Sequence, residues 1–129
     1  MAVHVRNKTS ASRRAVASNG ITAVTVFTFG TSLVDPDGSA SGLGGILKRT
    51  RLYNPDTVGH RVKLHLVPSG GALGVDTVIY DNIVGVNCVD YCEFIEEAAD
   101  GDFLQVVLGE AATTTQVQIK PVVSEMKAT

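Results

Sequence analysis

Short runs in which apolar and polar residues alternate dominate this chain, and such alternation is typical of β-strands with one buried face. The first run spans residues 21–29, where β-branched and aromatic residues alternate with threonines. Six further runs, separated by Gly, Pro, Asn and Asp, cover Ile46–Tyr53, Arg61–Val67, Val75–Tyr80, Ile83–Val89, Phe103–Leu108 and Thr115–Val123. The pattern predicts an all-β fold, an antiparallel β-sandwich or jelly roll of about seven to eight strands with an extended N-terminal arm.

The run Arg61–Val67 illustrates how the faces are assigned. Alternation places Val62, Leu64 and Leu66 on the core side. The opposite, solvent-facing side then carries Arg61, Lys63 and His65 and is cationic. Residues 93–100 are the only stretch with helical composition, and they predict at most a short excursion between strands.

The 129 residues are expected to form one domain. Residues 1–20 are polar and basic without a sustained period, so we expect an extended arm that lies against a neighbouring surface. Residues 21–129 form the sandwich domain. Within it, residues 30–45 are rich in Gly and Ser and contain the turn Asp35-Pro36-Asp37-Gly38, which predicts a long loop.

Composition excludes several classes of protein. No stretch approaches the roughly 18 consecutive apolar residues of a membrane-spanning helix, and no apolar run near residue 1 resembles a signal peptide, so we expect a soluble protein without membrane association. Cys88 and Cys92 lack redox or zinc spacing, and on a strand they lie too far apart for a disulfide, so half-buried reduced thiols are expected.

The formal net charge of −2 conceals a strong asymmetry along the chain. Residues 1–63 hold nine basic and three acidic side chains, whereas residues 64–129 hold two basic and ten acidic ones. Nine acidic residues and no basic residue occur between Asp76 and Glu110. A uniform nucleic-acid-binding surface is therefore disfavoured, and oppositely charged faces could meet between copies or against a shell.

No catalytic, cofactor or metal site is predicted. The three histidines, His4, His60 and His65, are scattered over an arm, a turn and a solvent face, without zinc spacing. The Gly-rich run of residues 42–48 lacks the ending of a phosphate-binding loop and leads into a strand. A calcium site that combines the turn at residues 35–39 with the turn at residues 100–102 is the alternative to solvated carboxylates, and a late bidentate glutamate is missing. The protein is expected not to be an enzyme.

The basic residues are the candidate interface. In Lys48-Arg49-Thr50-Arg51, alternation puts Arg49 and Arg51 on one face with Tyr53, and Lys48 on the other. An acidic surface on another copy, a nucleic acid or the simple protection of an edge strand by charge would each account for them. The predicted interface residues are Arg6, Lys8, Arg13, Arg14, Arg49 and Arg51.

The succession of turns over residues 52–71, from Tyr53-Asn54-Pro55-Asp56 to Val67-Pro68-Ser69-Gly70-Gly71, resembles a group of small virion proteins of tailed bacteriophages. Residues 78–82, the Gly-Asp-led strand 101–106 and the Thr-rich turn 113–115 are also similar to that group. The similarity covers roughly residues 46–124 and leaves out the arm and the Gly-rich loop.

The resemblance implies a non-enzymatic structural β-sandwich in a phage particle, namely a cement or decoration protein on the capsid surface. Its partners would be the major capsid protein or other virion subunits, and it would form a homo-oligomer, with a trimer as the expected state, without binding nucleic acid directly. The alternative is a tail, neck or head-fibre component whose sandwich binds a glycan or receptor.

Overall fold

The computed structural model describes residues 3–9, 15–16, 22–29, 42–93, 95–109 and 117–128 of the chain. The backbone is described throughout these ranges, and side chains are described from residue 22 to 29 and from residue 45 to 123 within them. The described residues form ten strands, which are β1 Val3–Thr9, β2 Ala15–Val16, β3 Val24–Thr28, β4 Gly42–Tyr53, β5 His60–Val67, β6 Val78–Val84, β7 Val89–Cys92, β8 Glu96–Ala98, β9 Phe103–Leu108 and β10 Gln118–Ala128.

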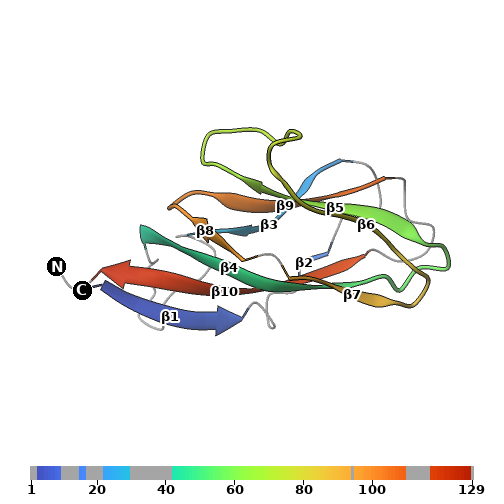
Figure 1. Ribbon diagram of the computed structural model, residues 1–129, viewed down its shortest axis with the longest axis horizontal. Coiled ribbons are helices and arrows are strands. Elements are labelled where there is room, and N and C mark those ends of the chain that lie inside the picture. The colour runs from blue at the N-terminus through green and yellow to red at the C-terminus, as the bar shows by residue number, and fades with distance from the viewer. Residues whose placement is uncertain are drawn as a thin grey trace.

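The strands form two antiparallel sheets that lie face to face (Figure 1). The larger sheet has the order β1-β10-β4-β7, with β2 added to β10 and β8 added to β4. The smaller sheet has the order β3-β9-β5-β6. When the short β2 and β8 are set aside, the pairs are nested, because β1 pairs with β10, β3 with β9, β4 with β7 and β5 with β6. This nesting is that of a long hairpin rolled into two sheets, which is a jelly roll.

The predicted fold class is confirmed, and the main boundary errors have local causes. The predicted strands 61–67 and 103–108 agree with β5 and β9 to within one residue. Residues 75–80 and 83–89 were predicted as two strands, but Asp81 and Asn82 lie inside the single strand β6. The residues predicted to be helical contain the strand β8, which extends the sheet beside the start of β4.

The segment predicted as an arm contributes to the larger sheet. Val3–Thr9 is extended and pairs along its whole length with β10 of the same chain, and Ala15–Val16 pairs with the start of β10. Most of the predicted loop at residues 30–45 lies outside the described residues, but its end is already strand, because β4 begins at Gly42.

The core lies between the two sheets and follows the period of two. In β9, Leu104, Val106 and Leu108 are buried and the intervening residues are half-buried. Phe27 and Phe29 of the first predicted run are buried against each other, with ring centroids 4.9 Å apart at 84°. The other large, fully buried apolar side chains come from both sheets and are Leu47, Leu52, Val62, Leu64, Val67, Val84 and Ile119.

Candidate interaction surface

The outer face of the larger sheet takes its side chains from β4, β7 and β10. Thr50 and Leu52 of β4 are fully buried, so the alternating Arg49, Arg51 and Tyr53 point away from the core. The ladder between β4 and β10 is irregular between Pro121 and Val123. Because proline has no backbone N–H to donate, a strand that contains proline tolerates it at such an irregularity. The shift leaves two consecutive residues of β4, Lys48 half-buried and Arg49 exposed, outside the core.

Two arginines on this face lie over tyrosine rings. The Arg49 guanidinium lies 3.7 Å from the centre of the Tyr91 ring, and its Nε is 2.9 Å from a carboxylate oxygen of Glu93. The Arg51 guanidinium lies 5.7 Å from the Tyr53 ring. Stacking of this kind orders a guanidinium at a surface before it meets a partner. It also covers ring surface that a carbohydrate-binding site would use to stack a sugar.

Arg51 and Lys120 lie directly opposite each other in the register of β4 and β10, and Tyr91 lies opposite Arg51 on the other side. Directly opposed residues of antiparallel strands project on the same side, so the row Lys120-Arg51-Tyr91 crosses the outer face. Neither Arg51 nor Lys120 has a carboxylate partner among the described residues. This end of the face therefore carries two adjacent positive charges.

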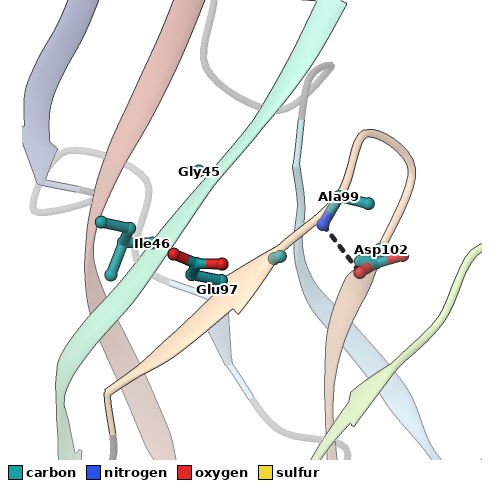
Figure 2. Close-up of a pocket in the computed structure, with 6 residues that line it drawn as sticks. Gly45, Ile46, Glu97, Ala99 and Asp102 are labelled. Atoms are coloured by element: carbon teal, nitrogen blue, oxygen red, sulfur yellow. Dashed lines mark hydrogen bonds between the residues drawn. The ribbon is translucent and has the colours of Figure 1, made fainter.

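The other end of the same face is acidic. β7 and β8 pair with opposite ends of β4 (Figure 1). Glu97 of β8 lies opposite Ile46 in the register, and both face away from the buried Gly45 and Ala98. Glu97 is exposed and borders a pocket of about 590 Å³, which is also lined by Gly45, Ile46, Ala98, Ala99 and Asp102 (Figure 2).

Asp102, on the far side of this pocket, binds backbone N–H groups with its carboxylate. Its carboxylate accepts the N–H of Ala99 at 2.8 Å, drawn in Figure 2, and that of Ser69 at 3.0 Å. It therefore joins the β8–β9 turn to the loop after β5. No group of three or more metal-ligating side chains occurs among the described residues, and residues 35–39 of the alternative calcium site lie outside them.

A buried polar cluster, formed by Asn54, Asp56 and His60, fills the connection between β4 and β5. His60 Nε2 lies 2.6 Å from Asp56 Oδ2, and neither side chain is exposed to solvent. His60 Nδ1 is buried and has no hydrogen-bond partner in the described part of the chain. Although histidine and carboxylate are the residue types of a general acid or base, no substrate reaches a pair sealed in this way.

Asn54 holds the polar cluster to the neighbouring elements. Its side-chain amide donates to the carbonyl oxygens of Val58 at 2.9 Å and Val84 at 3.0 Å, and its carbonyl oxygen accepts the Asp56 N–H. The predicted turn at residues 54–56 therefore forms by the expected side-chain-to-backbone bond. The burial of His60 was not predicted, since the sequence pattern placed it in a turn, whereas it begins strand β5.

His65 was predicted on a solvent face and is in fact buried, with 5% of its surface exposed. The register between β5 and β6 shifts between Leu64 and His65, and Thr77 from the following loop covers the ring. His65 Nδ1 lies 2.8 Å from the Thr77 hydroxyl, which also donates to the Gly74 carbonyl. Burial, assisted by the nearby Lys63 charge, lowers the pKa of His65 below its ordinary value.

The two sheets are also joined at the side where β6 and β7 lie. The Tyr80 hydroxyl donates to the Asp90 carboxylate across this side, and burial together with this bond raises the pKa of Tyr80. On the smaller sheet, Arg61 forms a bidentate hydrogen bond to Asp81 with both distances 2.8 Å, and this bond lowers the pKa of Asp81.

The two cysteines form no disulfide, but they differ in burial, since Cys92 is buried and Cys88 exposed.

The structure brings together only part of the predicted interface. Arg49 and Arg51 share the outer face, as alternation predicts. Arg6 and Lys8 lie on β1 at the edge of the same sheet, opposite Glu125 and Val123. The remaining two, Arg13 and Arg14, lie outside the described residues. Sequence reasoning missed Lys120, Tyr91 and Glu93, because only the register of β10 and β7 against β4 places them beside the arginines.

Comparison with known proteins supports the fold. No protein-family model matches the chain, and no curated protein matches it. A protein of Bacillus endospore appendages, described as a novel family of disulfide-linked pili, superimposes with a TM-score of 0.51 at 14% identity over 98% of this chain and 88% of that one. At this identity the likeness concerns the fold alone.

Chains from two strains of infectious bursal disease virus also superimpose. The Gx strain gives a TM-score of 0.49 at 11% identity over 98% of this chain, and the Gt strain gives 0.39 at 10% identity over 97%. The protein spans 33% and 32% of the length of these viral chains. In the described part of the chain, no helix is long and apolar enough to cross a bilayer.

Proposed function

We propose that this protein is a non-enzymatic structural subunit that binds neighbouring subunits of an ordered assembly through the outer face of its larger sheet. The observation that carries the proposal is the row of Arg51 and Lys120, two adjacent cations without carboxylate partners among the described residues, beside the partly exposed Tyr91. Tyrosine and arginine are enriched at protein interfaces, and side chains that are already ordered lose less entropy on binding.

The assembly that fits best is the particle of a tailed bacteriophage. Jelly rolls recur in viral capsid domains, and the turns of residues 52–71 resemble those of small phage virion proteins. Because one fold serves many functions, the position of the protein in the particle is a separate step of the proposal. We place the protein on the capsid surface as a cement or decoration subunit, bound across neighbouring capsid subunits and made in the host cytoplasm.

Reversal of the unpaired charges tests the proposed surface. Purified particles that lack the protein are incubated with the full chain or with the Arg51→Glu/Lys120→Glu variant, and binding is measured by co-sedimentation. We expect the variant to fold and to lose binding, because reversed charges repel the acidic partner surface. The matched control is Lys63→Glu, a reversed cation on the smaller sheet, which should bind normally. Equal binding of all three proteins would disprove the proposed surface, and electron micrographs of labelled particles test the capsid location.

The basic residues of the predicted arm need a separate test. Deletion of residues 1–18 would remove β1 and expose the edge of β10, so loss of binding by the truncated protein would not separate contact from folding. The variant Arg13→Glu/Arg14→Glu changes charge without removing a strand. It should bind particles more weakly if the arm contacts a neighbour, and unchanged binding would restrict the interface to the sheet.

A further inference from the structure

The outer face of the larger sheet has opposite charges at the two ends of one strand. Arg51 lies near the end of β4 together with Lys120, and Glu97 lies beside Ile46 near its start. The five residue steps from Ile46 to Arg51 correspond to about 16 Å along an extended strand. Arg49 and Glu93, which neutralise each other at 2.9 Å, occupy the region between. Among the described side chains, this face therefore carries two adjacent cations at one end, an arginine–glutamate pair in the middle and the Glu97 carboxylate at the other end.

A surface with this arrangement complements itself when one copy is turned by 180°. The basic end of each copy then faces the acidic end of its partner, and the neutral centres meet on the two-fold axis. On this basis we infer that two copies of this chain pair through the outer faces of their larger sheets, with Arg51 and Lys120 of each copy opposite Glu97 of the other. The inference rests on the proposed function and assigns this face to a second copy of the chain, which is then the neighbouring subunit that Arg51 and Lys120 bind.

Size and chemistry fit a pair of this kind. A twelve-residue strand with three neighbours presents a face of roughly 700 Å². A standard interface buries about 800 Å² per partner, so the face is near the size that a stable dimer needs. Val89 and Tyr91, which are 40% and 39% exposed, supply apolar surface beside the charges. The pocket next to Glu97 offers space for the aliphatic stem of an incoming basic side chain.

A charge swap within one chain tests the pairing. Sedimentation equilibrium of the full chain should give a dimer, and Arg51→Glu or Glu97→Lys alone should weaken it about 100-fold or more, because like charges then oppose each other. The combined variant Arg51→Glu/Lys120→Glu/Glu97→Lys restores opposite charges on both sides of the axis. It should dimerise with itself but not with the wild type. All three positions lie outside the core, and circular dichroism with thermal melting verifies that each variant folds.

Several results would overturn the inference. They are a wild type that stays monomeric up to about 1 mM, a swapped protein that stays monomeric, or one that mixes freely with the wild type. Should a variant that carries Arg51→Glu fail to fold, Arg51→Gln replaces it in the same scheme. The particle assay separates this inference from the proposed function, since a monomeric wild type whose particle binding requires Arg51 and Lys120 rejects only the dimer.

Discussion

At the scale of single residues, the buried pair of Asp56 and His60 is the most demanding interaction in the described structure. Removal of Asp56 would leave His60 Nε2 without its partner at a site where Nδ1 already has none. We expect Asp56→Ala to lower the free energy of unfolding by about 3 kcal/mol, in the range measured when one member of a buried pair is removed. Asp56→Asn keeps an acceptor oxygen near Nε2 and should cost less.

Urea denaturation measures both losses. Asp100→Ala, at an exposed position of the β8–β9 turn, is the matched control and should change stability by no more than about 0.5 kcal/mol. If Asp56→Ala were as stable as this control, the polar cluster would contribute nothing to holding the β4–β5 connection.

Protonation of His65 should make the free energy of unfolding depend on pH. Its pKa is lowered in the folded protein, chiefly by burial, so the unfolded chain binds a proton more readily. The contribution of His65 to the free energy of unfolding is therefore complete above the ordinary histidine pKa of 6.5, and it is lost as the pH drops below that value. In His65→Asn, which keeps a nitrogen near Thr77 but does not titrate there, the stability lost between neutral and acid pH should be smaller. Parallel urea titrations at several pH values test this, and identical slopes for both proteins would contradict the assignment.

These residues also mark what the sequence can and cannot predict. Arg49 and Arg51 were placed on one outer face because alternation along a single strand is a local property. The burial of His60 and His65 was not predicted, because it depends on distant parts of the chain. Val84 of β6 lies opposite His60, and the loop that carries Thr77 covers His65. A ring that a later loop covers leaves no signal in the strand that contains it.

At the scale of elements, β6 and β1 were misjudged for a related reason. Asp81 and Asn82 are common turn residues, yet the partner strand β5 keeps them extended, and Asn82 accepts the N–H of Ile83 with its own side chain. The strand β1 has no sustained apolar alternation, and its backbone is paired by β10 instead. Strand pairing over a long sequence separation thus overrides local preference.

The turn between β8 and β9 provides an element-scale prediction. Gly101 has φ of +87°, and a Cβ added there would lie 2.6 Å from Ser69 Oγ. Gly70 has φ of +76° with no atom within 4 Å of such a Cβ. Gly70→Ala should therefore cost only the left-handed backbone, about 1 kcal/mol, and Gly101→Ala should cost more because Ser69 must move.

Thermal melting of the two glycine variants measures the difference between their losses of stability. Both positions have a positive φ, so this difference reports the contact with Ser69 alone. The Ser69→Ala/Gly101→Ala double variant should recover part of the loss, because the Oγ that collides is gone. Equal melting temperatures for Gly70→Ala and Gly101→Ala would mean that Ser69 moves away from the new Cβ without loss of stability.

At the scale of the whole molecule, nested pairing explains what becomes of the charge asymmetry. A jelly roll sets each early strand beside a late one, so a basic first half and an acidic second half meet inside one molecule. Arg61 of β5 pairs with Asp81 of β6, and Arg49 of β4 pairs with Glu93 after β7. Some of the opposite charges that suggested contact between copies therefore form ion pairs within the chain. The charges of Arg51, Lys120 and Glu97 can still bind a partner.

The last prediction follows from this division between internal and external charges. The internal ion pairs are exposed, and exposed pairs contribute little to stability, so added salt should leave the free energy of unfolding nearly unchanged. Association through Arg51 and Glu97 should weaken steadily between about 0.05 M and 0.5 M salt, as the Debye length shrinks from roughly 14 Å to about 4 Å. Sedimentation equilibrium over this range, with urea denaturation at the same salt concentrations, measures both quantities. Association that resists salt would show that Val89 and Tyr91, rather than the charges, hold the copies together.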